Sequence, residues 1–322
     1  MYSLKQTLLD QKKLPWICRD IGETHMNREH FAQNTVFGTD LVFKEYCGLA
    51  PNYHTKAILP SGPVLYDNKP WSGYANYPIP TVMDCDPSKA TDWLELGKTH
   101  FIPTACAFAY VIAMMRYKYP SSEGKGSIFF LLHSDRWLSS THNYEALIDA
   151  LESLPEKYKP ITISLFWRDY LEGKHEQFPG YKIVSTGHRF DPVHFHRLYH
   201  LIRMHKYVLV NGWTMPPIHA LLMNKPVRLL DAPLPQLELR DKNVASESVR
   251  NMMLENKSLL EGNAASNYDW IIEQFRDFDE DKPTTEQLRY ADVVSGIEYI
   301  KDPNELKLDF SFAERLIRHE IK

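Results

Sequence analysis

The sequence predicts an α/β fold built on a parallel sheet with helices on both faces. Beyond residue 126, short runs that are almost continuously apolar alternate with segments whose apolar residues recur at helical spacing. Strands that are apolar on both faces are typical of buried parallel sheets, and their alternation with helices is typical of repeated strand-helix-strand units. We therefore expect a Rossmann-like half whose strands are Ser127–Ser134, Ile161–Trp167, Tyr181–Thr186, Tyr207–Gly212 and Pro226–Asp231.

Helices are expected between these strands, at Asn143–Leu154, Asp191–Lys206 and Pro216–Asn224. The second of them begins with Asp followed by Pro, residue types that are favoured at a helix N-cap and in the first turn. Its residues Phe195, Leu198 and Ile202 recur at the spacing of one helix face. The pattern predicts a single strand-helix-strand step across Val184–Gly212, a stretch that holds five histidines.

The length of 322 residues suggests two domains, at about 100–200 residues per domain. Residues 1–122 are expected to form an N-terminal α/β domain, and residues 123–322 a C-terminal Rossmann-like domain whose terminal helices can pack back on the first domain. The Pro120–Gly126 segment, rich in Ser and Gly, has the composition of a hinge. The predicted architecture is two Rossmann-like domains that face a cleft.

The composition argues against several classes of protein. The formal net charge is −4 and Lys and Arg are spread along the chain, so no basic surface for nucleic acid is indicated. DNA is kept only as an alternative substrate. The longest apolar run, Thr104–Met115, is shorter than the ~20 residues of a membrane span. No secretory signal is recognised at the N-terminus, and the four cysteines lack metal-binding spacing. We expect a cytosolic protein, and a peripheral position at the inner face of the membrane is compatible with this expectation.

Polar residues follow the carboxyl ends of the expected strands. Ligands of open parallel sheets bind at this edge, where helix N-termini also offer N–H groups to anions. The sequence has no glycine-rich dinucleotide motif, P-loop, nucleophile elbow or zinc-protease motif, so side chains and helix ends are expected to hold any phosphate. The candidates for phosphate are Arg168, Arg189, His188 and Thr214. The residues expected at the binding edge are His133, Ser134, Trp167, Arg168, Thr186, Gly187, Asn211, Gly212, Trp213 and Thr214.

His188 is expected near the start of the helix that follows the third strand. The positive end of a helix dipole disfavours a protonated imidazole, so we expect a neutral donor that is charged only when a phosphate is bound. A loop histidine bonded to the backbone is the alternative. His196 and His200 are four residues apart and share a helix face, as metal-binding pairs do, but no accompanying carboxylate motif is found and helix packing is favoured.

Several blocks of the sequence resemble, in order, those of GT-B-type glycosyltransferases from bacterial surface-polysaccharide (capsule and lipopolysaccharide) loci. The blocks are FGTDLVFKEYCGLAPNY, LLHSDRW, ISLFWRDYLEG, VSTGHRFDPVHFHRL and VLVNGWTMPPIHALLMNKPV. The resemblance covers about Val36 to Leu230 and is stronger in the second half. It implies that the second half binds the nucleotide part of a sugar donor and that the first half binds the acceptor.

The resemblance also assigns residues. It places His133 and Ser134, Trp167 and Arg168, Gly187 and His188, and Asn211 through Thr214 around the donor, and it matches Lys225–Pro226 to a turn into the last strand. Two departures are present. Ser61–Gly62 stands where relatives tend to have His–Gly, which bears on the catalytic base. Trp213 and a Pro–Pro pair stand where relatives tend to have small hydroxyl residues, which bears on the identity of the donor.

Glycosyl transfer needs a base for the acceptor hydroxyl and cationic or N–H partners for the leaving phosphate. Asp40, in the FGTD block, is the chosen base, with Asp84 and Asp86 behind it, and His188 is the second expected catalytic residue. Asp86 also has the context of an N-cap. Asp84 and Asp86 have the spacing of a metal-binding pair, but this spacing is frequent by chance, so no metal site and no cofactor are predicted.

The predicted function is therefore metal-independent transfer of a sugar from a nucleotide-sugar donor to a glycan or lipid-linked acceptor. A sugar-nucleotide epimerase of the same architecture is one alternative, and it would need two acid/base groups at one sugar carbon. A catalytically degenerate binding or assembly subunit is another, because Ser61–Gly62 replaces the expected His–Gly.

Overall fold

The computed structural model describes residues 13–21, 29, 31–62, 70, 72–119, 123–134, 138–240 and 268–320. The chain divides into two compact units. The first unit comprises Met1–Asp20, Ser121–His188 and Arg197–Leu288, and the second comprises Ile21–Pro120, Arg189–His196 and Arg289–Lys322. Each unit is thus assembled from separate stretches of sequence. The division at residue 122 stays a prediction, and residues 120–122 of the expected hinge lie outside the described residues.

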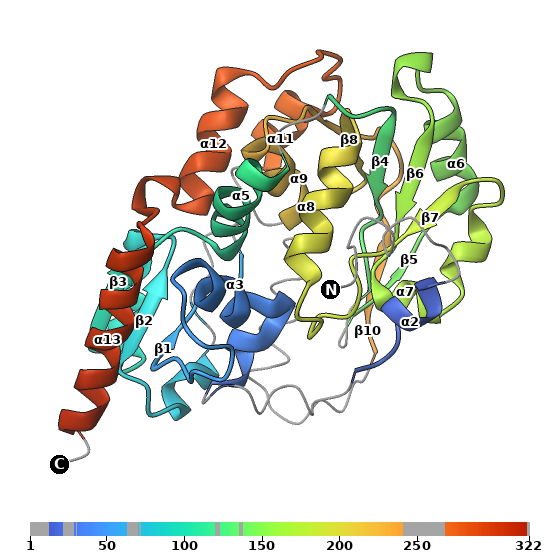
Figure 1. Ribbon diagram of the computed structural model, residues 1–322. Helices are drawn as coiled ribbons and strands as arrows, with labels where there is room; N and C mark the ends of the chain where they lie inside the picture. The colour runs from blue at the N-terminus through green and yellow to red at the C-terminus, as the bar shows by residue number, and fades with distance from the viewer. Residues whose placement is uncertain are drawn as a thin grey trace. The chain divides into compact units, whose positions relative to one another are not determined.

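The first unit is built on a five-stranded parallel sheet (Figure 1). Its strands are β4 (Ser127–Phe130), β6 (Ile161–Ser164), β7 (Lys182–Val184), β8 (Tyr207–Val210) and β9 (Val227–Leu229). Their order across the sheet is β7-β6-β4-β8-β9, the Rossmann order 3-2-1-4-5 when the strands are counted along the chain. This confirms the expected α/β fold with a parallel, Rossmann-like sheet. The strands are shorter than expected because the expected ranges also took in residues of the loops that follow them, such as Leu131–Ser134 and Leu165–Phe166.

Helices cover the two faces of this sheet. Leu147 and Leu151 of α6 (Tyr144–Glu152) pack in one hydrophobic core with Phe129 and Ile163 of the sheet. Thr162, whose side chain points to the opposite face, bonds through its hydroxyl to His205, the residue after α8 (His194–Met204). Figure 1 shows α6 and α8 on opposite sides of the sheet, as the right-handed crossover rule requires for this strand order.

The remaining elements of the first unit surround the sheet. A separate antiparallel pair is formed by β5 (Leu138–Thr141) and β10 (Gln236–Leu239). The further helices are α2 (Leu14–Ile17), α7 (Trp167–Leu171), α9 (Met215–Leu222) and α11 (Tyr268–Phe275), with short 3-10 turns η6 (Glu156–Tyr158) and η7 (Lys174–Gln177). The helix α8 begins at His194, three residues later than expected, because the Asp191 side chain accepts a hydrogen bond from Val193 N and holds a turn before the helix.

The second unit has a smaller parallel sheet, in the order β1-β2-β3. Its strands are β1 (Ala57–Ile58), β2 (Thr81–Asp84) and β3 (His100–Pro103). Its elements also include η3 (Ala32–Gly38), α3 (Thr39–Tyr46), η4 (Ser72–Asn76), η5 (Pro87–Lys89), α4 (Ala90–Glu95), α5 (Ala107–Lys118), η8 (Ile297–Tyr299) and α13 (Pro303–Glu320), while α12 (Thr285–Ser295) spans the division. Phe31, Ile58, Val82 and Trp93 form one of its cores. Asp86 caps η5 by accepting from Ser88 N, as its sequence context predicts.

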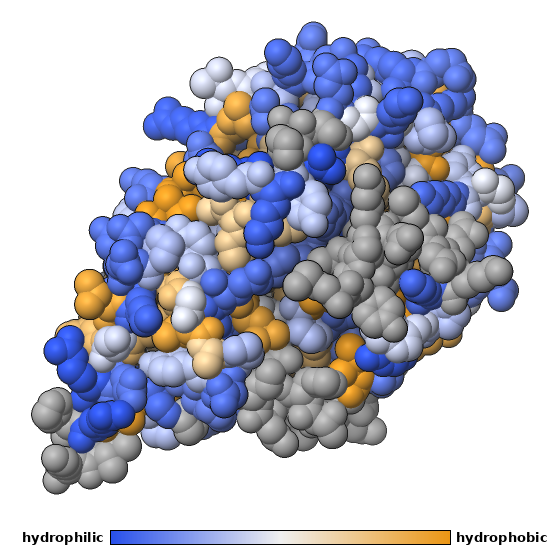
Figure 2. Space-filling view, in the orientation of Figure 1, coloured by the Kyte–Doolittle hydropathy of each residue, from blue (hydrophilic) through white to orange (hydrophobic). Residues whose placement is uncertain are grey.

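The surface seen in Figure 2 is mostly hydrophilic, with hydrophobic side chains gathered over α13, where Leu308 and Phe312 are exposed. Within the part of the chain that the structure describes, none of the helices combines the length and the apolar character needed to cross a bilayer.

Truncation of a buried side chain in a central strand should destabilise the first unit strongly. Leu209, in β8, has no exposed surface and belongs to the core between the sheet and α6. Leu209→Ala is expected to lower the free energy of unfolding by about 2–5 kcal/mol, because the cavity adds to the lost burial. The control Leu171→Ala, at a side chain that is 51% exposed, should change it by less than about 0.5 kcal/mol. Urea unfolding followed by circular dichroism measures both, and equal values would contradict the assigned core.

Candidate functional site

The candidate site lies at the carboxyl edge of the five-stranded sheet. From β4 the chain proceeds to β6 and β7 on one side and then to β8 and β9 on the other, so the strand order reverses between β4 and β8. Ligands of open α/β sheets bind outside the carboxyl ends of the strands at such a switch point. In this chain the switch point is bordered by the loops Leu131–Ser134 and Asn211–Thr214.

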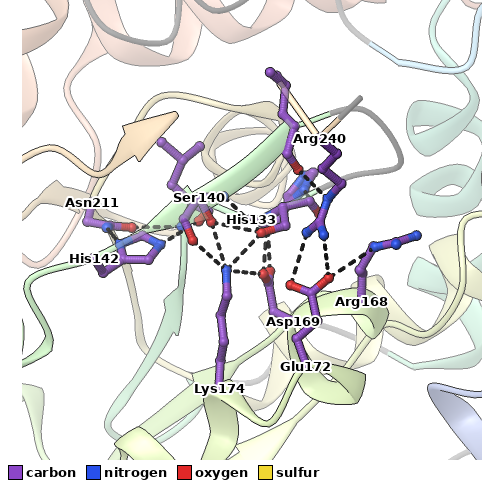
Figure 3. Close-up of polar contacts among 12 residues, drawn as sticks. His133, Ser140, His142, Arg168, Asp169, Glu172, Lys174, Asn211 and Arg240 are labelled. Atoms are coloured by element: carbon purple, nitrogen blue, oxygen red, sulfur yellow. Dashed lines mark hydrogen bonds and ion pairs between the residues drawn. The ribbon is translucent and has the colours of Figure 1, made fainter. Parts of the chain in front are cut away.

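Three residues close a ring of hydrogen bonds at the switch point. Leu132 N donates to Asn211 Oδ1 at 2.8 Å, Asn211 Nδ2 lies 3.2 Å from His142 Nδ1, and His142 Nε2 lies 2.9 Å from Leu132 O (Figure 3). The ring is satisfied when the imidazole is neutral with its proton on Nε2, because Nδ1 then accepts from the Asn211 amide. A proton on Nδ1 would set two donors against each other. Leu132, His142 and Asn211 are all buried. Their hydrogen bonds join the loop after β4 to the loop after β8.

The environment keeps His142 in this neutral form. Burial, followed by the positive charge of Lys174, lowers the pKa of His142 to about 4. At neutral pH His142 is therefore uncharged and keeps its hydrogen bonds to Leu132 and Asn211.

Lys174 organises the adjacent loop. Its Nζ lies 2.6 Å from Asp169 Oδ1, 2.8 Å from Ser134 Oγ, and 2.7 Å from the carbonyl oxygen of Ser140 (Figure 3). Asp169 in turn accepts from Ser134 N with both carboxylate oxygens, at 3.2 and 3.1 Å. A buried charge is stable only when it is paired and hydrogen-bonded, and both charges meet this condition here. Together these contacts position Ser134.

A second group of charges lies beside the first. Glu172 accepts from Arg168 Nε at 3.2 Å and from both terminal nitrogens of Arg240, at 2.7 and 2.9 Å. Burial alone would raise the pKa of Glu172, but the hydrogen bonds and charges of Arg240 and Arg168 outweigh it and lower the pKa. Arg240 also donates to the carbonyl of Leu138, which attaches β5 to this group.

Aromatic rings follow the ends of β6 and β7. The rings of Trp167 and His188 are 4.1 Å apart, and His188 Nε2 lies 3.4 Å from Asp20 Oδ1. His133 packs on Phe166 at 4.4 Å. Trp167 is buried, and its indole N–H has no hydrogen-bond partner among the described residues.

The other expected donor residues lie along the same edge with different partners. The Thr186 carbonyl accepts from Arg197 Nη1 at 2.6 Å, and Gly187 N donates to Ser185 Oγ. Gly212 approaches Leu132 so closely that a Cβ would lie 2.8 Å from its side chain. Trp213 packs its buried ring on Phe275 at 4.5 Å, inside the unit. Thr214 is the N-cap residue of α9 without a capping side-chain bond.

The structure thus joins His133, Ser134 and Asn211 around the switch point, and it joins Trp167 to His188. The roles of these residues, and of Arg168, Thr186, Gly187, Gly212, Trp213 and Thr214, in donor binding stay predictions.

Asp40, the expected base, lies in α3 of the second unit and has no exposed surface. It accepts from Lys44 Nζ at 3.1 Å, and Lys44 also pairs with Glu29, whose pKa is raised by burial. A general base must contact the acceptor hydroxyl. Asp40 meets that requirement only if the chain around it moves, and its catalytic role stays a prediction.

The residues of the site that the sequence does not indicate include Ser140, His142, Glu172, Lys174 and Arg240. None of them directly follows a strand of the parallel sheet, so the rule that selects strand ends passes over them. Lys174 lies in a largely polar stretch, Arg168–Gln177, whose composition does not single it out. Arg240 reaches the site through the antiparallel pairing of β10 with β5, which strand periodicity does not predict.

Among the described residues, none of the His, Cys, Asp and Glu side chains gather in groups of three that could hold a metal ion. His196 of α8 lies 3.3 Å from Glu45 Oε2 and is part of the second unit.

The sequence matches no family model and no curated protein. A solved structure of S. aureus MnaA with UDP is similar over 83% of this chain and 67% of that chain, with 16% sequence identity and a TM-score of 0.34.

Removal of the Lys174 charge should destabilise the first unit. Lys174→Met leaves the Asp169 carboxylate buried without its counter-ion, at a site where the two side chains are 12% and 0% exposed. We expect the free energy of unfolding to fall by about 3–5 kcal/mol. Urea unfolding provides the measurement. In Lys174→Met/Asp169→Asn, part of the loss should be recovered, since no unpaired charge is left.

The matched control is Lys159→Met. Lys159 pairs with Glu156 at 2.8 Å, but the two side chains are 37% and 87% exposed. This substitution should cost less than about 1 kcal/mol. A similar cost for both lysines would contradict the role of Lys174 as the organiser of the loop.

The neutral His142 makes stability depend on pH. Its pKa is about 4 in the native state and 6.5 in the unfolded chain, so between these values only the unfolded chain binds the proton. The stabilisation is complete above pH 6.5 and is lost as the pH falls toward 4, by up to about 3 kcal/mol. We expect the difference in unfolding free energy between wild type and His142→Gln to shrink over this range. The other histidines are present in both proteins, so parallel curves would contradict the assignment.

Proposed function

We propose that this protein binds a nucleotide sugar at the carboxyl edge of the five-stranded sheet and transfers its sugar to a glycan or lipid-linked acceptor. The observation that carries the proposal is the strand order β7-β6-β4-β8-β9. It brings the loops Leu131–Ser134 and Asn211–Thr214 to the switch point, the position where open α/β sheets bind nucleotides.

The charged side chains near this edge suit a diphosphate. Arg168, Lys174 and Arg240 accompany two carboxylates, those of Asp169 and Glu172, which leaves an excess of positive charge. Cations stabilise the negative charge that develops on a leaving nucleoside diphosphate. Arg168 is the best placed to turn toward a phosphate, because its side chain is one third exposed while Lys174 is enclosed by its partners. Lys174 then acts by holding the loop.

The rings at the strand ends suit a nucleoside and a sugar. The pairs His133–Phe166 and Trp167–His188 follow the three neighbouring strands β4, β6 and β7. Aromatic faces bind bases by stacking without demanding one base identity, and His133–Phe166 is the partly exposed pair, whereas Trp167 and His188 are buried. His188, a member of the second pair, serves as the donor to phosphate in this proposal.

The acceptor side is assigned to the second unit, in line with a GT-B arrangement, and no metal or cofactor takes part in the proposed transfer. Asp40 is kept as the proposed base, and this role requires the chain around it to move so that its carboxylate contacts the acceptor hydroxyl.

A melting-temperature screen with UDP, GDP, CMP and dTDP sugars tests the proposal. One nucleotide should stabilise the protein, because a ligand that binds only the native state adds about 2.7 kcal/mol at 100 times its Kd. His188→Ala should raise the Kd of that donor about tenfold or more, which corresponds to the loss of one hydrogen bond to a charged group. The control His100→Ala, in β3 of the second unit, should leave the Kd unchanged.

The products then distinguish the reactions. Transfer to an acceptor supports the proposal, an isomerised nucleotide sugar formed from donor alone would identify an epimerase instead, and binding without turnover would identify a binding subunit. No stabilisation by any of the four donors would refute the proposal.

A further inference from the structure

The outer face of α13 carries apolar side chains that the second unit leaves exposed. On the inner face, Leu306 and Phe310 are buried, and the Phe310 ring packs on Phe43 with the ring centroids 6.4 Å apart. The helix and these contacts all belong to the second unit. On the outer face, Leu308 is 67% exposed and Phe312 is 40% exposed. Figure 2 shows hydrophobic side chains gathered over α13, and exposed apolar surface of this kind marks an interaction site.

The outer face has the spacing of a coiled-coil helix. A stripe along it, named here the α13 stripe, consists of Glu305, Leu308, Phe312 and Arg315. Its members are separated by three, four and three residues, which is the spacing of the a and d positions of heptads. The two charged members are exposed, as the two apolar members are. The stripe thus has an apolar centre, a carboxylate toward the start of the helix and a guanidinium toward its end.

A groove of about 540 Å³ lies beside the first half of the α13 stripe, within the second unit. Leu308 supplies part of its apolar lining. The charge of Lys301 in the groove is matched by Asp309, whose Oδ2 lies 2.5 Å from Lys301 Nζ. Glu298 and Glu305 then add negative charge to the lining. The groove therefore suits an apolar side chain that is accompanied by a cation.

Two copies of α13 complement each other when they lie antiparallel. If the helices cross at residue 310, Leu308 of each copy faces Phe312 of the other, and Glu305 of each faces Arg315 of the other. A two-fold interface uses the same patch on both copies, so both kinds of contact occur twice. A parallel pair would instead set like charges opposite each other. The order of charges along the stripe therefore favours an antiparallel second copy.

We propose that the α13 stripe is the interface of a homodimer of this protein, in which each groove receives Phe312 and Arg315 of the second copy. The observations that carry the inference are contacts and exposures within the second unit alone. The inference does not depend on the proposed function, because no nucleotide takes part in it.

Sedimentation velocity of the full chain over about 1–100 µM is the first measurement, because a single pair of helices forms an interface at the small end of the specific range. We expect wild type to pass from monomer to dimer over this range. Leu308→Asp should raise the dissociation constant of the dimer at least about tenfold, since it places an unpaired carboxylate opposite Phe312. A wild type that stays monomeric throughout would overturn the proposal.

The matched control is Leu94→Asp. Leu94, in α4, is 56% exposed and belongs to the same unit, but it is not a member of the α13 stripe. The dissociation constant should be unchanged in this variant. Both positions are exposed, so both variants should keep the melting temperature of wild type. An equal loss of dimer in the two variants would contradict the assigned interface.

Reversal of the charges tests the antiparallel pairing itself. Glu305→Arg and Arg315→Glu should each weaken the homodimer about tenfold or more, because like charges then face each other. An equimolar mixture of the two variants should dimerise as wild type does, since each copy then meets opposite charges. A mixture that stays monomeric would rule out this pairing.

The fold of Glu305→Arg is checked by circular dichroism, because Glu305 Oε2 also accepts from Asp302 N at 3.0 Å. Arg315→Glu leaves this bond intact. If Glu305→Arg does not fold, the homodimer of Arg315→Glu alone decides, and a dissociation constant equal to that of wild type would overturn the proposal.

Membrane binding is the competing use of an exposed apolar helix face. Vesicles of phosphatidylcholine and phosphatidylglycerol distinguish it, since an interfacial helix inserts its apolar face and its cations contact anionic lipid. Dimerisation without vesicle binding would support the proposal. A monomeric wild type that binds these vesicles, and loses the binding in Leu308→Asp, would identify a membrane contact instead.

Discussion

The hydrogen-bond ring of Leu132, Asn211 and His142 is the constraint on which the candidate site depends. It joins the two strands between which the sheet reverses its order, and it satisfies a buried backbone N–H and C=O at the point where β4 ends. Since a neutral imidazole is needed to complete it, the lowered pKa of His142 is part of the structure of the edge rather than a sign of proton transfer. The charged side chains of the edge lie beside this hydrogen-bonded junction.

Lys174 connects this junction to the rest of the edge. Its charge helps keep His142 neutral, and its contacts with Asp169 and Ser134 hold the loop after β4. Beside Lys174, Glu172 accepts hydrogen bonds from Arg168 and Arg240. Carboxylates therefore set the positions of the cationic side chains at this edge. In the proposed function, side chains held in this network take the place that backbone N–H groups have in glycine-rich phosphate loops.

The sequence allows the parallel sheet and its helices to be predicted because strands buried on both faces read as apolar runs, as at Ser127–Phe130 and Tyr207–Val210. It also indicates which residues follow the strands, including Ser134 and Asn211. It does not indicate Lys174 or His142, whose importance comes from three-dimensional contacts made by loops. Nor does it indicate that Trp213 turns inward onto Phe275 or that Asp40 is buried against Lys44, since polarity and position along the chain do not report the direction of a side chain.

The discontinuity of the second unit has a consequence for biosynthesis. Tyr46 donates its hydroxyl hydrogen to the carbonyl of Lys301, 255 residues later, and Phe310 of α13 packs on Phe43. The early residues of this unit therefore emerge from the ribosome long before the helix that covers them, and closing so long a loop adds to the entropic barrier. The residues of the five-stranded sheet lie between these two segments of the chain, so the order of translation allows that sheet to form before α13 is available to complete the second unit.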